Sequence, residues 1–403
     1  MRAAESRSGA LVAQDAAVDS ARQMALQAAR LPDPVLRLSI DNLPVDGPQR
    51  WSLAGDFMTM RSIGLAQTLT REGKRQARAS RYEREADEAL AVRTARLLDL
   101  RRHTARAWFD LHYQQQLLDL LSQQKDELAL QVEAASAAYR AGRGGLSDVF
   151  MARMESARVE DRIQEARAQE ANAALGLARW TGAPHSGRLG PVPAISRTRA
   201  LEQGLEQHMA GHPDVALMDS KEAVAWADVE VAVQDKQADW SVSAMYSRRG
   251  SAFSDMVSLA VSVPLTWDQK NRQDRNVSAQ LARAAQARAE REETLRERLT
   301  ETKRWFHTWR SHLARLSDYD ANLIPLAASR TEAELLAYRN GKAGLSSVLE
   351  SRRLEIGMRI ERLRIEMATA ALWVELEYLG LDAHGSEPPA RPQGTASLLE
   401  SKP

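Results

Sequence analysis

Two segments of this chain decide its fold: Tyr139-Arg140-Ala141-Gly142-Arg143-Gly144-Gly145-Leu146-Ser147-Asp148-Val149 and, 199 residues later, Tyr338-Arg339-Asn340-Gly341-Lys342-Ala343-Gly344-Leu345-Ser346-Ser347-Val348. Tyr, Arg, Gly, Gly, Leu, Ser and Val stand in register, and long helical sequence flanks both copies. Glycine adopts positive φ at little cost and commonly ends helices. Each copy therefore predicts the tip of a hairpin of two long antiparallel helices, with Ser147 and Ser346 capping the second helix.

The composition favours long helices over compact globular domains. Charged residues make up 27% of the chain and aromatic residues 5%, a mixture typical of coiled coils. The net charge of +1 lacks the basic excess of nucleic-acid-binding proteins, so we expect no nucleic-acid partner. Without cysteine the chain has no disulfide and no thiolate metal site. No apolar run approaches the ~18 residues of a membrane helix, so a membrane crossing would require strands.

The longest helical pattern covers residues 73–139. Heptad spacing counted from Leu90 places apolar residues at ten of fourteen seam positions as far as Ala135, which indicates coiled-coil-like packing. Such a helix would be roughly 100 Å long. No compact domain needs a helix of that length, so we expect it to bridge two distant places.

Two other regions alternate with a period of two, as strands do. Leu36, Leu38 and Ile40 alternate with polar residues, and Val257 begins the cleanest such run, which continues to Leu265. Alternation of apolar with small polar residues over such lengths is typical of membrane barrel strands. Four strands in one chain leave open edges, which a bilayer does not tolerate. The sequence therefore predicts that several copies of the chain close the sheet.

The order of these elements predicts a mainly α protein with a small β part, built from two internal repeats. The predicted ranges are 1–180 for the first repeat (β-hairpin about 35–69, helix 73–139, tip 140–146, helix 147–180), 181–211 for a linker, 212–382 for the second repeat (β-hairpin about 239–265, helix 271–338, tip 339–345, helix 346–381) and 383–403 for a disordered tail. Pro325 is expected to bend the second long helix.

This arrangement resembles the TolC-like outer-membrane factors over about residues 10–382. The resemblance depends on the duplication, on the repeated tip motif and on two similar strand-to-helix junctions, Gln67-Thr68-Leu69…Gly73-Lys74-Arg75 and Val263-Pro264-Leu265…Lys270-Asn271-Arg272. The stretch from Asp41-Asn42-Leu43-Pro44 through Asp56-Phe57-Met58-Thr59-Met60-Arg61 is similar to the heavy-metal efflux branch.

The resemblance implies a homotrimer in the lipid of a Gram-negative outer membrane. Four strands from each protomer would form a twelve-stranded β-barrel, and the helices would form a periplasmic tunnel. The trimer would be the exit duct of a tripartite efflux system. It would receive substrates from an inner-membrane RND-type pump and a periplasmic adaptor (membrane fusion) protein. Heavy-metal cations are among the candidate substrates. Family members carry an export signal and a longer first helix, so we expect that this chain's start is truncated or misassigned.

The family resemblance implies that the tips dock the adaptor, and it predicts Leu146 and Leu345 as exposed anchors. The alternative is that any helical hairpin needs such a turn; the repetition of Tyr, Leu and Ser favours docking. The predicted docking residues are Tyr139, Gly142, Gly145, Leu146, Ser147, Tyr338, Gly341, Gly344, Leu345 and Ser346.

Two carboxylates and two methionines near these regions carry weaker hypotheses. Asp148 and Glu350 would form rings at the mouth of a trimer, but an ordinary acidic residue near a helix N-terminus is the favoured interpretation. Met58 and Met60 would be soft ligands on one face of a strand, but packing or lining is favoured because two thioethers make a poor site. No other metal site is predicted.

Catalytic constellations are absent from the sequence: it has no phosphate loop, nucleophile elbow, zinc-protease helix or dinucleotide fingerprint. We therefore predict no enzyme activity and no cofactor. Two other hypotheses remain open. A periplasmic adaptor would have one hairpin flanked by lipoyl-like and barrel segments, and a soluble coiled-coil scaffold would lack strict strand alternation.

Overall fold

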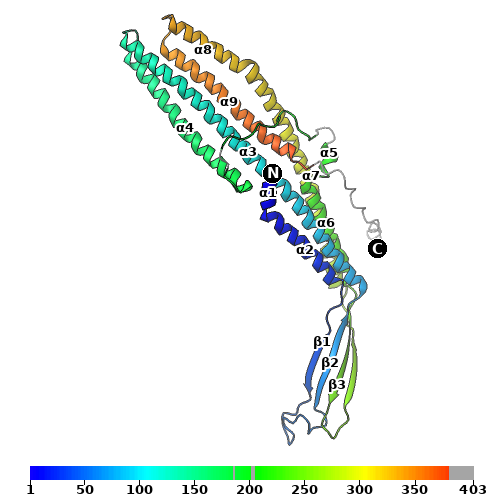
Figure 1. Cartoon of the computed structure of the whole chain (residues 1–403). Helices are drawn as coiled ribbons and strands as arrows, with labels where there is room; N and C mark the ends of the chain where they lie inside the picture. Colours follow the sequence, from blue (N-terminus) through cyan, green and yellow to red (C-terminus); the bar gives the residue numbers. More distant parts are fainter. Residues whose placement is uncertain (185–186, 201–204, 381–403) are drawn as a thin grey trace. The chain divides into compact units, whose positions relative to one another are not determined.

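The computed structural model describes residues 1–184, 187–200 and 205–380, so the predicted tail 383–403 and the end of the last predicted helix lie outside the described residues. The chain divides into two compact units (Figure 1). The sheet unit comprises residues 9–95 and 214–294, and the tip unit comprises residues 1–8, 96–213 and those from Leu295 onward. Each unit contains segments of both sequence repeats, so the boundaries of the units differ from the boundaries of the repeats.

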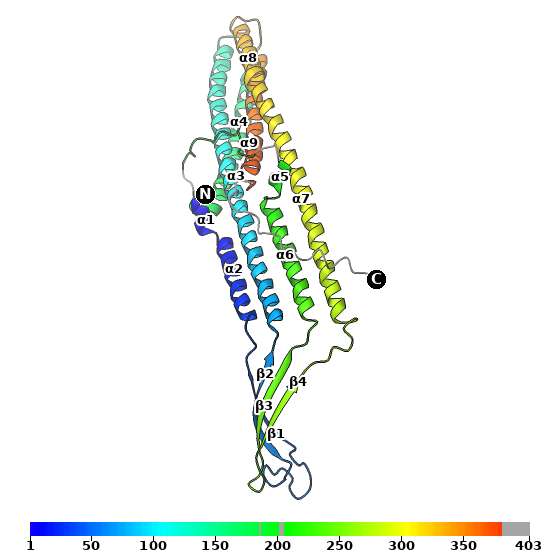
Figure 2. The same cartoon turned by 90° about the vertical axis from the view of Figure 1, so that its right-hand side faces the viewer.

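The sheet unit contains the four predicted strands as one antiparallel sheet in the order β1-β2-β3-β4 (Figure 2). Its strands are β1 Val35–Asp41, β2 Met60–Leu69, β3 Trp240–Arg248 and β4 Met256–Ser262. The two hairpins of the sequence prediction are confirmed, and β2 pairs with β3 to join them, with Leu69 opposite Trp240.

Two strand ends differ from the sequence prediction. The strand β2 begins at Met60 and so excludes Met58, because the Asp56 carboxylate accepts the Met58 N–H at 2.7 Å and folds the preceding residues into a loop. The strand β4 ends at Ser262 instead of Leu265. Pro264 has no N–H to donate to a neighbouring strand, which accounts for the early end.

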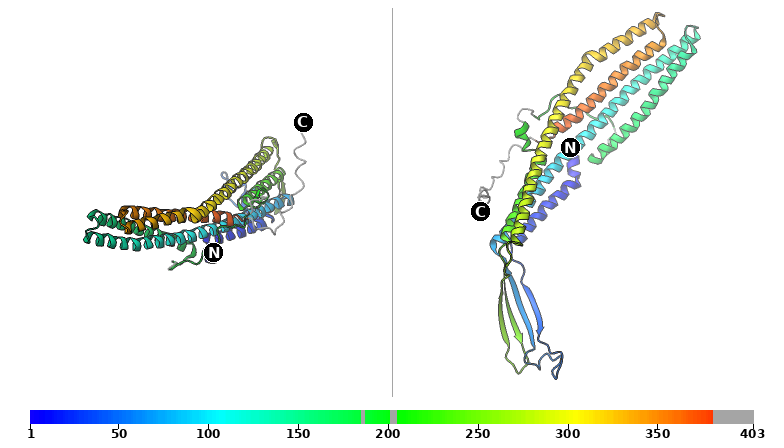
Figure 3. Two further views of the ribbon diagram at one scale, coloured as in Figure 1. Left: turned by 90° about the horizontal axis from the view of Figure 1, so that it is seen from above. Right: turned by 180° about the vertical axis from the view of Figure 1, so that it is seen from behind.

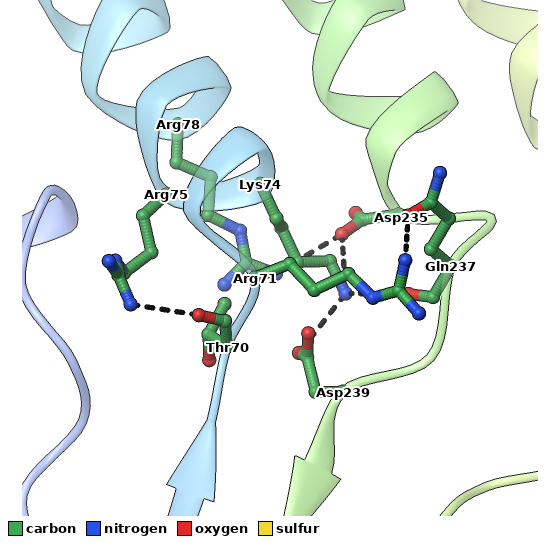
Figure 4. Close-up of polar contacts among 8 residues, drawn as sticks. All are labelled: Thr70, Arg71, Lys74, Arg75, Arg78, Asp235, Gln237 and Asp239. Carbon is green, nitrogen blue, oxygen red and sulfur yellow. Dashed lines mark hydrogen bonds and ion pairs between the residues drawn. The ribbon is translucent and has the colours of Figure 1, made fainter.

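Helices α2 Gly9–Ala28, α6 Pro213–Gln234 and the first parts of α3 and α7 complete the sheet unit. Lys74, near the start of α3, has a side chain only 10% exposed and contacts the chain between α6 and β3 (Figure 4). Its ammonium lies 3.2 Å from Asp235 Oδ1 and 3.1 Å from Asp239 Oδ2. Arg78 also pairs with Asp235, at 3.2 Å. These contacts join the β2-to-α3 junction to the α6-to-β3 junction.

The tip unit contains two helical hairpins that lie alongside each other with their tips at the same end (Figures 1 and 3). Hairpin 1 is formed by α3 Glu72–Arg140 and α4 Leu146–Thr181, and hairpin 2 by α8 Ile324–Arg339 and α9 Leu345–Glu377. The tip unit also holds the short helices α1 Arg2–Arg7 and α5 Leu205–Met209. The second long helix, predicted as one segment, is α7 Gln273–Asp318, a π-helical turn Tyr319–Leu323 and α8. Pro325, which lacks an N–H donor, lies just after this turn.

An aromatic core holds the tip unit together. Phe109, Phe306 and Trp373 are buried in one cluster, with Trp309. Trp309 Nε1 donates to the Ile195 carbonyl at 3.0 Å, and Trp373 Nε1 donates to the Arg197 carbonyl at 2.6 Å. The connecting segment 187–200 is therefore attached to the helices by two partly buried indole hydrogen bonds.

Candidate functional site: the hairpin tips and the sheet faces

Both long helices end in the same hydrogen-bonded turn. Gly142 has φ +69° and Gly341 has φ +71°. The N–H that follows each glycine reaches back to the carbonyl of Ala138 or Ala337, and each glycine N–H bonds to the carbonyl of Tyr139 or Tyr338. This is the Schellman pattern, in which a left-handed residue satisfies the last helical carbonyls. The helix ends inferred from the two glycines are thus present in both tips.

The helices after the tips begin differently from the prediction. Gly145 and Gly344, both with extended backbone, are the N-cap residues of α4 and α9. Ser147 and Ser346 therefore lie inside the first helical turn, and the prediction that they cap the helices is wrong. In the first tip the Asp148 carboxylate accepts the Gly145 N–H at 3.1 Å instead.

The second tip has no such carboxylate. Ser347 occupies the position of Asp148, and its hydroxyl donates to the Gly344 carbonyl at 2.8 Å. Asp148 thus does what the favoured interpretation expected of it, an acidic residue satisfying a helix N-terminus. Glu350 is exposed. The carboxylate ring at an aperture stays a prediction for both residues.

The two tip leucines have opposite surroundings. Leu146 is 47% exposed, whereas Leu345 is 4% exposed. Leu345 packs in a cluster with Ala135, Val149 and Ala152 of hairpin 1. The prediction of two exposed anchors is therefore wrong for Leu345, because a neighbouring hairpin covers it.

The tyrosines follow the same division, since Tyr139 is exposed and Tyr338 is packed against the cluster that contains Leu345. Two exposed apolar residues that the sequence analysis did not single out, Phe150 and Met154, follow Leu146 at four-residue spacing on α4. That spacing places the three side chains on one helical face. The spacing was available in the sequence, but their exposure was not.

The methionine hypothesis loses its geometric basis. Met58 lies in the loop before β2, where its carbonyl accepts a hydrogen bond from Asn42 Nδ2 at 3.4 Å, and Met60 is the first residue of the strand. The assumption that both lie in one strand is wrong. Among residues 1–184, 187–200 and 205–380, no group of three or more His, Asp or Glu residues is placed to hold a metal ion.

The sheet has one apolar and one polar face. Directly opposed residues on adjacent strands share a face, and two such rows are Leu36–Leu65–Ala244–Leu259 and Leu38–Ile63–Tyr246–Val257. All eight are exposed. The opposite face carries the rows Arg37–Gly64–Met245–Ser258 and Ser39–Ser62–Ser247–Met256.

Hydrogen bonds run across the polar face. The hydroxyls of Ser62 and Ser247 are 2.9 Å apart, and those of Ser39 and Ser62 each donate to Asp41 Oδ2 at 2.9 Å. These serine hydroxyls of the polar face are therefore paired with one another or with Asp41, while no part of the chain that the structure describes covers the two rows of the apolar face. Within the described part of the chain, no helix is both long and apolar enough to span a bilayer.

A charged cluster connects hairpin 2 to its π-helical turn. Arg362 of α9 donates to Asp320 through Nε at 2.7 Å and Nη2 at 3.1 Å, and it also pairs with Glu366. The hydrogen bond from Arg362 lowers the pKa of Asp320, and the bond to Asp320 raises the pKa of Arg362. The positions 199 residues before Asp320 and Arg362 are Leu121 and Ile163, which are buried in one apolar cluster between hairpin 1 and α9.

Comparisons with known proteins agree with this architecture. The "Outer membrane efflux protein" family pattern matches residues 1–183. No curated protein matches the chain. Among solved structures, the outer-membrane channel OprN is 17% identical with a TM-score of 0.79, and the alignment covers 94% of this chain and 88% of OprN.

Two further structures are similar in the same way. CusC, described as forming a transmembrane channel, is 16% identical with a TM-score of 0.80 over 94% of this chain and 90% of CusC. VceC, an outer membrane protein of Vibrio cholerae, is 18% identical with a TM-score of 0.75 over 94% of each chain. The sequence of the first 183 residues thus matches the outer membrane efflux protein family, and the chain has the TolC-like fold that these channels share.

Proposed function

We propose that the chain is one protomer of a homotrimeric exit duct in a Gram-negative outer membrane. The observation that carries this proposal is the division of the four-stranded sheet into an exposed apolar face and a hydrogen-bonded polar face. A sheet with these faces suits a barrel with lipid outside and water inside. Three copies would supply twelve strands, and closure would leave no unpaired edge in the bilayer.

The duct is passive in this proposal. It has the fold of outer-membrane channels, and it would provide a water-filled path while an inner-membrane RND-type pump selects the substrate and supplies the energy. The polar face offers small hydroxyl side chains and Arg37, which suit a wet lumen better than a closed core. The resemblance to the heavy-metal branch stays a prediction, because the described residues give no ligand set that would distinguish metal cations from other cargo.

The periplasmic adaptor would dock at the hairpin tips, where two structurally similar turns present exposed backbone and side chains. In the first tip the exposed residues include Tyr139, Gly142 and Ser147; in the second they include Gly341 and Ser346. Leu345 takes no part, because it is buried in the chain itself. A trimer would present six such tips of two kinds, which differ at Asp148 and Ser347 among other positions.

Membrane fractionation tests the proposal. The full chain, preceded by a cleavable export signal, is expected in the outer-membrane fraction of a Gram-negative host. On gels it should migrate as a trimer unless heated, and it should form conducting pores in planar bilayers. A chain that remains a soluble monomer in the periplasm would refute the duct and favour the coiled-coil scaffold.

A second measurement separates the duct from an adaptor. Leu259 lies on the apolar face and is 80% exposed, so Leu259→Arg would place a charge in lipid, at a cost of ~2–4 kcal/mol near the bilayer midplane. The duct predicts reduced membrane assembly for Leu259→Arg and normal assembly for the opposite-face variant Ser258→Arg. Equal assembly of both variants would contradict a lipid-facing sheet.

A further inference from the structure

The apolar face of the sheet ends in a charged row at the loop end of the strands. Ile40 lies opposite Arg61, and Arg61 lies opposite Arg248. Because successive side chains of a strand point to opposite faces, both arginines share the face of the neighbouring Ile63 and Tyr246. Both arginines are exposed. The row lies at the end of the sheet that is farthest from the helices of the same unit (Figure 2).

Two like charges in this arrangement are unfavourable unless an anion neutralises them. Side chains directly opposite each other on adjacent strands are neighbours, and like charges there destabilise the sheet. In the part of the chain that the structure describes, neither Arg61 nor Arg248 forms an ion pair with a carboxylate. The Arg61 side chain has one hydrogen bond there, from its Nη2 to the Arg249 carbonyl at 3.2 Å, and the Arg248 side chain has none.

Two carboxylates at this end of the strands bind other groups. Asp41 lies on the polar face, where its Oδ2 accepts the hydroxyls of Ser39 and Ser62. Asp255, between β3 and β4, accepts the hydroxyl of Tyr246. The two guanidinium groups therefore keep most of their N–H donors for a ligand outside the chain, and that ligand has to be an anion.

The length of β3 places the arginines at a membrane interface of the proposed duct. Trp240 is the first residue of β3 and Arg248 the last, and their even spacing places them on one face. At ~3.4 Å per residue the two lie roughly 27 Å apart along the strand, similar to the ~25 Å apolar band of a membrane barrel. With the helices on the periplasmic side, the arginines lie at the outer interface, where a charge on the lipid face costs little.

We propose that Arg61 and Arg248 bind the phosphate group of a phosphorylated lipid whose acyl chains lie on the apolar face. A guanidinium group binds phosphate oxygens through two parallel hydrogen bonds. The arginines line a shallow depression together with Leu38, Ile40 and Ile63, which suit acyl chains. A soluble anion or an uncharged lipid would contact one part of this surface and not the other. The proposal rests on the proposed duct, because the sheet meets such a lipid only in a bilayer.

Lipid binding to the assembled protein tests the site. The full chain is exported, extracted from outer membranes in detergent and stripped of native lipid. Bisphosphorylated lipid A is then added, and native mass spectrometry measures its binding. The wild type should bind this lipid more tightly than fully dephosphorylated lipid A. Arg248→Gln should bind it about tenfold more weakly, because charged hydrogen bonds to the phosphate are lost.

Three further variants define the outcome. Arg37→Gln removes a charge from the opposite face of the same sheet and should bind the lipid as the wild type does. Arg248→Lys keeps the charge but loses the two parallel hydrogen bonds, so its affinity should lie between those of the wild type and Arg248→Gln. Arg61→Gln/Arg248→Gln should lose the preference for the phosphorylated lipid.

A heat-modifiable trimer in which the wild type and Arg248→Gln bind the phosphorylated lipid equally would overturn the lipid site and leave the duct intact. Equal binding of phosphorylated and dephosphorylated lipid A would have the same consequence. Displacement of the lipid by inorganic phosphate at the same concentration would overturn the lipid as the ligand, because the acyl chains would then contribute nothing. Chains that stay soluble monomers would overturn the duct and the lipid site together.

Discussion

Removing the Lys74 side chain is expected to loosen the junctions where strands meet helices. The ammonium group is nearly buried between Asp235 and Asp239. In Lys74→Met, Asp235 keeps its ion pair with Arg78. Asp239 keeps no cation: its side chain is 23% exposed, and its Oδ1 already has no hydrogen-bond partner within the described residues.

The expected cost follows from that uncompensated carboxylate. Breaking a buried ion pair by removing one partner costs ~3–5 kcal/mol, and the remaining exposure of Asp239 reduces this to about 2 kcal/mol. Local opening at the junction should then be about 30-fold more frequent, since each ~1.4 kcal/mol is tenfold. Hydrogen exchange of the amides around 236–240, measured in the assembled protein, gives this ratio.

Two further variants decide whether the reasoning is right. Lys74→Met/Asp239→Asn removes both charges and should recover most of the lost protection. Arg84→Met breaks an exposed pair with Asp87 and should change exchange by less than about fivefold, because such pairs contribute ~0–1 kcal/mol. Unchanged protection in Lys74→Met, or no recovery in the double variant, would refute the view that an orphaned carboxylate sets the cost.

Three other perturbations have defined outcomes. Leu345→Ala should lower the stability of the packed hairpins by about 2–3 kcal/mol, because it leaves a cavity in the cluster between them. Hydrogen exchange of the amides at both tips measures this loss, and a loss below 1 kcal/mol would contradict the burial of Leu345. Gly142→Ala should lower the free energy of unfolding by ~1–2 kcal/mol through the positive φ alone, since a Cβ at this position contacts nothing. Gly176→Ala, inside α4, should raise the free energy of unfolding by ~0.5–1 kcal/mol. Thermal unfolding of the two variants measures both changes. The lowered pKa of Asp320 means that its contribution is present above the unfolded pKa of ~3.9 and is lost as pH falls through the folded value. Hydrogen exchange of the amides 319–323 should thus rise on acidification in the wild type, by an amount that corresponds to ~0.5 kcal/mol because the pair is so exposed. The same rise should be absent in Arg362→Met. Identical pH profiles of the two proteins would exclude the Asp320–Arg362 pair as the cause.

The parts of the fold that depend on neighbouring residues in the sequence could be predicted. Gly142 and Gly341 end their helices because positive φ is a property of the residue itself. The alternation from Val257 onward predicted a strand because the period of a strand is fixed by its backbone. The Ser147 prediction was wrong for an equally local reason, since extended Gly145, two residues before Ser147, takes the N-cap position.

The rest depends on contacts between residues far apart in the chain. Nothing near Leu345 distinguishes it from Leu146, and only the placement of hairpin 2 against hairpin 1 buries one of them. Lys74 looked like one of several basic residues at a junction, and its partners are more than 160 residues away. Sequence reasoning therefore found the turns and strands of the site, and it missed which of two similar residues is covered.

The open edges of the sheet point to an assembly of several copies. In the sheet unit, β1 and β4 each have one unpaired edge. The four strands alternate in direction, so β4 of one copy and β1 of the next would pair antiparallel, in the same way as every pair inside the chain. The sheet unit thus leaves one free edge of each kind, and in the proposed oligomer rotation of identical copies about a common axis would pair these edges. Within the described residues, a monomer would leave both strand edges and the apolar face of the sheet uncovered, so we propose closure into a ring as the arrangement that covers them.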